Sequence, residues 1–160
     1  MEIEYSVKEK RNLFSHGLWS CGDYSNLEFN SNGPSSAISI EKSNDSSIIG
    51  YYCARFITKG DTDRYIGYRL NDLTDIVGKT VQFTAYIKNS VELQIAVYQH
   101  VNGSYQSQTA TVPVSDTFVP SSINIQINED AAHLLFRITN RSSNYNETIL
   151  YTDNWSLEEV

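Results

Sequence analysis

Residues 81–98 read VQFTAYIKNSVELQIAVY, and their pattern decides the fold of this 160-residue chain. Apolar side chains occupy every second position over residues 81–87, and mostly polar ones stand between them. The same alternation returns over residues 93–97, after a polar connection at residues 89–90. Successive side chains of a strand point to opposite faces of a sheet, so each segment predicts a strand with one buried face.

Similar segments recur along the chain at spacings of about 8–12 residues, which is typical of a β-sandwich or barrel. The 20 Ser, 14 Asn and 11 Tyr residues suit polar turns and half-buried sheets. Residues 71–78 are expected to form a short helical turn, capped by Asn71 or Asp72 and ended by Gly78. Further strands are expected over residues 37–41, 48–57, 65–70, 104–112, 123–127, 134–138 and 148–157. We therefore predict an all-β protein with eight or nine main strands.

Composition and charge exclude several classes of protein. The chain has 40% hydrophobic and 19% charged residues, which excludes a disordered chain. Proteins bind nucleic-acid phosphates through clustered Lys and Arg residues, whereas this chain has a net charge of −7. No nucleic-acid partner is therefore expected. No apolar run approaches the roughly 20 residues that span a bilayer, so no membrane insertion is expected. The N-terminal sequence MEIEY lacks the order of a signal peptide, and none is expected in the given chain.

One domain accounts for the length of the chain. We expect this domain over residues 12–160. Residues 1–11 mix charges with an alternation of Ile3, Tyr5 and Val7, so they form either an added edge strand or an arm that reaches a partner.

Three motifs occur in order along the expected domain: NLFSHGLWS at residues 12–20, VGKTVQF at 77–83 and LYTDNWSLEE at 150–159. They resemble the opening, a central strand and the final strand of the jelly-roll carbohydrate-binding modules found beside xylanases and cellulases and in phage tail proteins. The resemblance covers nearly all of residues 12–160. It implies a two-sheet antiparallel β-sandwich with jelly-roll topology, without catalytic residues, that binds a glycan on one exposed sheet face.

Jelly-roll order places the strands that start near Tyr65, Glu92, Ser104 and His133 in one sheet. Sugar recognition uses flat rings that stack on pyranose faces and planar polar groups that hydrogen-bond paired hydroxyls. The outward positions of this sheet supply such groups and are the ligand-binding candidates: Tyr65, Arg69, Gln94, Tyr98, His133 and Arg137. Gly67 and Ala96 are expected to leave room at the centre of this face.

Alternatives to a glycan face remain open. Tyr, Arg and Gln are also common on solvent-facing strands, where they form cross-strand pairs. Tyr and Arg also dominate protein–protein interfaces, so a protein partner would use the same residues. The second sheet offers a rival face, formed by Gln82, Tyr86, Lys88, Tyr51 and Arg55.

The resemblance also implies a structural calcium ion between the opening motif and the final strand, and no other cofactor. Asp153 matches the carboxylate of the final strand, whereas Ser20 stands where the opening motif frequently has Glu. Asp23 or Glu28 would supply the missing oxygen ligand, and the alternative without calcium is a solvated Asp153 that caps a turn. The acidic pair in residues 61–63 is interpreted as a polar hairpin loop.

Catalysis has little support in the sequence, and no enzyme is expected. His16, His100 and His133 are far apart along the chain. The chain has no His-Glu-x-x-His, Gly-x-Ser-x-Gly or Cys-x-x-Cys motif.

The Trp and Cys residues are assigned to packing rather than to a ligand site. Trp19 and Trp155 are interpreted as core or sheet-edge residues. Cys21 and Cys53 are interpreted as buried thiols, with a disulfide between them as the alternative.

The leading expectation is non-catalytic binding of a polysaccharide or cell-surface glycan, outside cells or at a virion surface. The alternative is a structural or receptor-binding component of a virus particle, such as a phage fibre, tail or capsid-decoration protein. In that case residues 1–11 would contact other virion proteins. The missing signal peptide, on a fold usually found outside cells, motivates the alternative.

Overall fold

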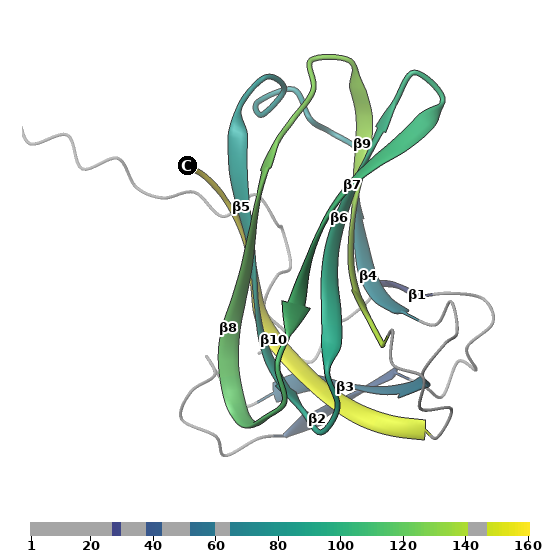
Figure 1. The fold of residues 1–160 in the computed structure, drawn as a ribbon, viewed down its shortest axis with the longest axis vertical. Helices are drawn as coiled ribbons and strands as arrows, with labels where there is room; N and C mark the ends of the chain where they lie inside the picture. Colours follow the sequence, from purple (N-terminus) through teal and green to yellow (C-terminus); the bar gives the residue numbers. More distant parts are fainter. Residues whose placement is uncertain (1–26, 30–37, 43–51, 60–64, 141–146) are drawn as a thin grey trace, which may run out of the picture.

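The computed structural model describes residues 27–29, 38–42, 52–59, 65–140 and 147–160. Ten strands in these ranges form two antiparallel sheets that pack face to face (Figure 1). Sheet A has the order β1 (Leu27–Phe29), β4 (Tyr65–Leu70), β9 (Ala131–Thr139), β6 (Leu93–Val101) and β7 (Ser104–Val112). Sheet B has the order β2 (Ile38–Lys42), β3 (Tyr52–Lys59), β10 (Glu147–Glu159), β5 (Thr80–Asn89) and β8 (Ser115–Gln126). The predicted two-sheet jelly roll is confirmed.

Successive strands often belong to opposite sheets, which is how the chain builds a sandwich rather than a meander. β5 and β6 follow each other in sequence but lie in sheets B and A, as β8 and β9 do. In contrast, β6 and β7 form a hairpin inside sheet A, closed by Asn102 and Gly103. These two residues have φ angles of 50° and 83°. Asn and Gly tolerate this left-handed backbone, so the pair forms a tight turn whose twist matches that of the strands.

The core lies between the sheets and is formed by the inward alternate positions of both. On β5 these are the positions expected from residues 81–87, and all four of these side chains have no exposed surface. Phe83 from sheet B packs against Phe136 from sheet A, with ring centroids 5.0 Å apart. Trp155 approaches Phe83 edge-on at 5.3 Å, and its Nε1 donates to Thr152 Oγ1 at 2.7 Å. The prediction that Trp155 packs in the core is confirmed.

A β-bulge in β10 directs Trp155 into the core. The pairing of β10 with β5 shifts register between Asp153 and Ser156, and Asn154 has a φ of 51°. The extra residue changes the alternation, because Asp153 lies on the outer side while Trp155, two residues later, lies inside. Asn adopts the left-handed conformation at low cost among non-glycine residues, which permits the bulge here.

The strand predictions hold with shifted boundaries. β8 begins at Ser115 rather than at residue 123, and β1 was not expected. The first half of β8 contains Pro120 and polar residues, which an edge strand tolerates because one of its sides has no sheet partner. β3 begins at Tyr52, while residues 48–51 lie outside the described residues. The predicted arm over residues 1–11 also lies outside them.

Residues 74–78 form a single hydrogen-bonded turn, which agrees with the expected short helical turn that follows Asp72 and ends at Gly78. The amides of Ile76 and Val77 both donate to Leu73 O at 3.0 Å, and Gly78 ends the turn with a φ of 76°. β4 ends at Leu70 in sheet A and β5 begins at Thr80 in sheet B, so this turn forms part of a short connection between the two sheets. No helix in the described ranges is long and apolar enough to cross a membrane.

Asp72 precedes this turn, and the pKa of its carboxyl group provides a test of its hydrogen bonds to Thr74. Its Oδ1 accepts from Thr74 Oγ1 at 2.7 Å and from Thr74 N at 3.1 Å, and both bonds lower the pKa of Asp72. We expect Thr74→Val to raise this pKa towards its ordinary value, because the hydroxyl donor is lost. Because the pKa of Asp72 is lower in the folded state than in the unfolded state, the ionised carboxylate stabilises the fold at pH values above the unfolded-state pKa. This stabilisation is lost as the pH falls through the folded-state pKa.

An NMR titration of the Asp72 carboxyl carbon measures the effect directly. Thr74→Ser is the control, since it keeps the hydroxyl and should keep the low pKa. Equal pKa values for Asp72 in the Val and Ser variants would contradict the assignment.

Candidate functional site

The six predicted ligand-binding residues all lie on the outer face of sheet A. β4, β9, β6 and β7 are neighbours in that order, and their registers align outward residues in rows across the sheet. One row contains Gly67, Arg137, Ala96 and Thr109. The rows on either side contain Tyr65 with Gln94, and Arg69 with Tyr98. The inward neighbours Ile66, Ile95 and Phe136 belong to the core, which confirms the predicted orientation of the strands.

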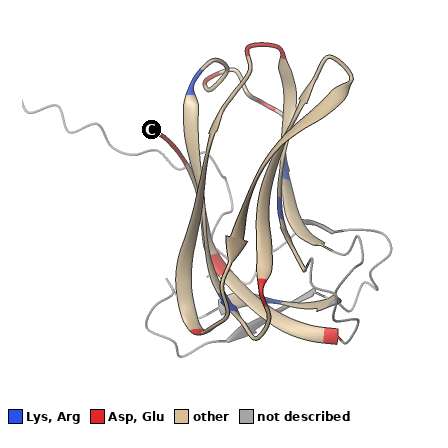
Figure 2. Cartoon of the chain, in the orientation of Figure 1, with Lys and Arg blue, Asp and Glu red and all other residues tan. Residues whose placement is uncertain are grey.

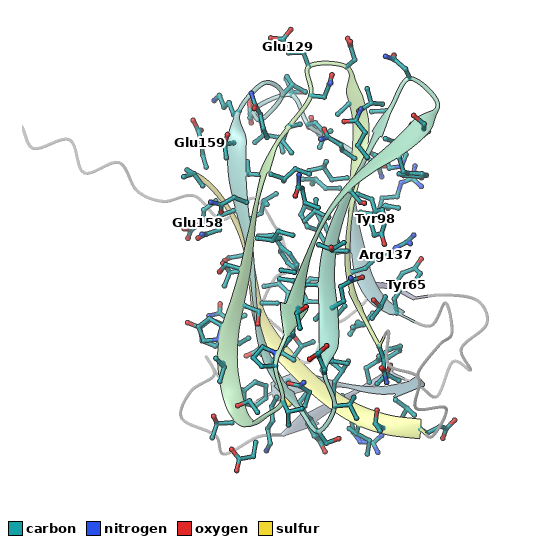
Figure 3. The ribbon with its side chains drawn as sticks, in the orientation of Figure 1. Tyr65, Tyr98, Glu129, Arg137, Glu158 and Glu159 are labelled. Carbon is teal, nitrogen blue, oxygen red and sulfur yellow. The ribbon has the colours of Figure 1, made fainter. Side chains whose placement is uncertain are left out.

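A stack of Tyr65, Arg137 and Tyr98 forms the centre of this face (Figure 3). The Cζ atom of Arg137 lies 4.0 Å from the centroid of the Tyr65 ring and 4.9 Å from that of the Tyr98 ring. The guanidinium is therefore held by cation–π contacts on two sides. Tyr65 is only 8% exposed, so its role is to support Arg137 rather than to present an open ring.

The expectation of free room at this centre is wrong. Ala96 is 0% exposed and Gly67 is also buried, because the Arg137–Tyr pair covers them. A Cβ atom on Gly67 would lie 2.6 Å from the carbonyl oxygen of Phe136 and 3.1 Å from Cδ2 of Tyr65. The small residues thus let the arginine and tyrosine side chains lie close to the sheet.

A second group of rings lies at the other end of the face. His100 stacks on His133 with centroids 4.9 Å apart and an interplanar angle of 11°. Tyr105 lies against both rings, and its hydroxyl is 3.0 Å from His133 Nε2. Arg69 Nη2 is 3.4 Å from His133 Nδ1. Tyr98 meets Tyr105 edge-on at 6.4 Å and so connects this group to the central stack.

Sequence reasoning missed His100 and Tyr105. The separation of the histidines in sequence hid their contact, because β6 and β9 pair and place His100 directly opposite His133. His100 shares the outward parity of Tyr98, and the Asn102-Gly103 turn sets Tyr105 opposite His100. Both signals are present in the sequence, so a register argument from the hairpin would have found them. His16 lies outside the described residues.

The rival face on sheet B has a different character. Gln82, Tyr86 and Lys88 lie on its outer side as expected, with Arg55 on the neighbouring part of β3, while Tyr51 is outside the described residues. Here rings pack on apolar groups: Phe118 and Cys53 are buried, with Tyr86 and Tyr151 packed against them. Lys88 Nζ lies 5.5 Å from the centroid of the Tyr151 ring.

The predicted calcium site is only partly described. Asp153 lies on the outer side of sheet B and is 0% exposed. Ser20, Asp23 and residues 61–63 lie outside the described residues, as does the side chain of Glu28. Among the side chains that are described, no three His, Cys, Asp or Glu residues come together to hold a metal ion. These side chains alone do not form a calcium site, so calcium stays a prediction from the resemblance.

The Cys and Trp assignments are also only partly testable. Cys53 is buried, as expected. Cys21 and Trp19 lie outside the described part of the chain.

Comparison with known proteins identifies the fold. No family model and no curated protein sequence matches the chain. The structure of TmCBM61 in complex with β-1,4-galactotriose has a TM-score of 0.66 and 14% identity, covering 94% of this chain and 99% of that one. The CBM22-1 xylan-binding domain of Xyn10C from Paenibacillus barcinonensis has a TM-score of 0.67 and 15% identity, with coverage of 90% and 92%.

A phage protein has the same architecture. The enzymatically active domain of tailspike protein 4 from bacteriophage CBA120 has a TM-score of 0.69 and 12% identity. The match covers 93% of this chain but 21% of that one, so one part of the tailspike is similar. The chain therefore has the jelly-roll β-sandwich fold that is shared by carbohydrate-binding modules and a phage tailspike domain.

Proposed function

We propose that this protein binds a glycan on the outer face of sheet A and performs no catalysis there. The observation that carries the proposal is the continuous surface of rings and planar donors from Tyr65 through Arg137 and Tyr98 to Tyr105 and the histidine pair. Tyr98 is half-buried and Tyr105 is 52% exposed, so both present ring surface to a ligand. All of these side chains lie on β-strands of sheet A.

The chemistry of this face suits a sugar chain. Aromatic faces bind the apolar faces of pyranose rings, and planar polar groups bind hydroxyls. Gln94 and Arg137 supply amide and guanidinium donors, and the outward residues of β7 add the hydroxyls of Ser107, Thr109 and Thr111. We expect weak binding by each site, because ordering water and side chains on a sheet face costs free energy.

The similar structures support a polysaccharide partner. TmCBM61 is in complex with a galactotriose, and the CBM22-1 domain is described as xylan-binding. If the partner is a polysaccharide or a cell-surface glycan, we expect the protein to act outside the cell or on a virion surface.

A glycan array with the purified chain tests the proposal. We expect Tyr98→Ala to weaken the binding of any glycan found by about tenfold or more, since a truncated aromatic anchor typically costs more than about 1 kcal/mol. Gln82→Ala is the matched control, because Gln82 lies half-buried on the outer face of sheet B. Circular dichroism shows whether each variant is folded.

Two results would contradict the proposal. Absence of binding to every glycan would exclude the glycan function. Binding that is lost in Gln82→Ala and kept in Tyr98→Ala would move the site to sheet B.

A component of a virus particle is the second candidate, favoured by the similarity to part of a phage tailspike. The two functions are compatible, because a particle protein can carry a glycan-binding domain. Light scattering on the full chain separates them. A particle component should form a symmetric oligomer, with residues 1–11 as its contact to other virion proteins, whereas a separate module should be a monomer.

A further inference from the structure

We propose that the glycan bound on sheet A is anionic, and that its carboxylate or sulfate group lies against the guanidinium edge of Arg137. This inference rests on the proposed function and specifies its ligand class. It comes from the surroundings of Arg137 and from the distribution of charge between the two sheets.

The stacking of Arg137 leaves the in-plane edge of its guanidinium for a ligand. Tyr65 and Tyr98 lie against the group at 4.0 and 4.9 Å. Both rings contact the group through cation–π interactions, and a guanidinium donates its N–H hydrogen bonds in its own plane. The buried Nε of Arg137 has no hydrogen-bond acceptor among the described residues. A planar fork of donors is the geometry that binds carboxylate, sulfate or phosphate with two parallel hydrogen bonds.

Arg69, the second arginine of this face, contacts Asn71 and His133. Its Nε donates to Asn71 Oδ1 at 2.8 Å, and its Nη2 lies 3.4 Å from His133 Nδ1. An ion pair at 3.4 Å joins Lys79, which precedes β5, to Glu159 of β10 in sheet B. Two guanidinium groups therefore lie on the face of sheet A with no described carboxylate to neutralise them.

The strands of the two sheets differ in charge (Figure 2): those of sheet A contain Arg69, Arg137 and Glu28, whereas those of sheet B contain six acidic and four basic residues. β4, β6, β7 and β9 contain two Arg, two His and no Asp or Glu, although the whole chain has a net charge of −7. β10 in sheet B alone contains Glu147, Asp153, Glu158 and Glu159. Figure 3 shows Glu158 and Glu159 on the side of the sandwich away from Tyr98, Arg137 and Tyr65, and Glu129 at the end of the molecule.

An anion fits this arrangement better than a neutral sugar does. A partly buried positive charge without a counterion has lost hydration that nothing has replaced. A neutral hydroxyl would accept its hydrogen bonds but would not neutralise it, whereas hydrogen bonds between two charged groups are roughly twice as strong. Acidic residues are absent from β4, β6, β7 and β9, which limits repulsion of such a ligand, and the acidic residue of this sheet, Glu28, is on the edge strand β1.

Matched glycans with and without the anionic group test the inference by isothermal titration calorimetry. Oligogalacturonide is compared with its methyl ester for the carboxylate, and sulfated with desulfated galactan oligosaccharide for the sulfate. We expect the anionic member of at least one pair to bind about tenfold more tightly, which corresponds to about 1.4 kcal/mol. This preference should shrink as salt is raised from about 0.01 M to 1 M, where screening is strong. The pair that shows the preference identifies the group.

Three variants separate recognition by Arg137 from a general effect of charge. Arg137→Gln should abolish the preference. Arg137→Lys should keep only part of it, because the charge remains while the planar fork is lost. Lys88→Gln removes the same charge from the outer face of sheet B and should keep the preference in full. Circular dichroism confirms folding, and if Arg137→Gln does not fold, the Lys variant and the salt dependence decide.

The failure of this inference is distinguishable from the failure of the proposed function. Equal or tighter binding of neutral glycans, still sensitive to Tyr98→Ala, would overturn the inference and leave glycan binding intact. Equal loss of the preference in Lys88→Gln would also overturn it, because that would indicate non-specific attraction. Absence of binding to any glycan would overturn both.

Discussion

Replacing Trp155 with alanine is expected to lower the free energy of unfolding by about 3–5 kcal/mol, the range for a large aromatic residue removed from a core. Trp155 is 1% exposed and packs edge-on against Phe83, which in turn contacts Phe136 of the opposite sheet. The substitution leaves a cavity between the sheets. It also removes the indole donor of Thr152 Oγ1, a hydroxyl that itself donates to the carbonyl of Tyr86 at 2.9 Å. Single domains are typically stable by only about 5–15 kcal/mol, so a large share of the stability would be lost.

Urea unfolding followed by circular dichroism measures this change. Trp155→Phe should lose less, because the ring still fills part of the space. Tyr105→Ala is the surface control, since Tyr105 is 52% exposed, and it should change the stability little. A loss for Trp155→Ala no greater than that for Tyr105→Ala would contradict the role given to Trp155 in joining the two sheets.

Gly67→Ala is expected to damage both the stability and the binding face. The added Cβ would lie 2.6 Å from the backbone oxygen of Phe136 on β9, so β4 must move away from its neighbour. The same atom would press on the Tyr65 ring, which supports Arg137. Overpacking of this kind costs about 1–3 kcal/mol. Displacement of Tyr65 should also weaken glycan binding, because Arg137 loses one of its two stacking partners.

Thr109→Ala is the matched control for the stability of Gly67→Ala, whereas Gln82→Ala on sheet B remains the control for glycan binding. Thr109 lies in the same row of the outer face, but on the exposed edge strand β7, where a smaller side chain meets no obstacle. Thermal unfolding and the glycan titration are measured on both variants. Normal stability and normal binding in Gly67→Ala would show that Gly67 does not set the position of Tyr65.

The orientation of the strands was predictable because it depends on local alternation. A strand repeats every two residues, so parity placed Tyr65, Arg69, Gln94, Tyr98, His133 and Arg137 on one side before any contact was known. The assignment of their strands to one sheet came from the resemblance to jelly-roll modules, and the observed order of β4, β9, β6 and β7 agrees with it. The bulge at Asn154 was not predictable from alternation, since one added residue reverses the parity that follows it.

The sequence by itself determined an all-β chain, the positions of its main strands and the side of the sheet on which each candidate residue lies. These properties depend on neighbours within a few residues. The tertiary structure decided which side chains meet. It placed the Arg137 guanidinium between Tyr65 and Tyr98, stacked His100 on His133, and filled the space expected over Gly67 and Ala96. Such contacts join strands far apart in the chain, so they depend on the register between strands, which local alternation does not specify.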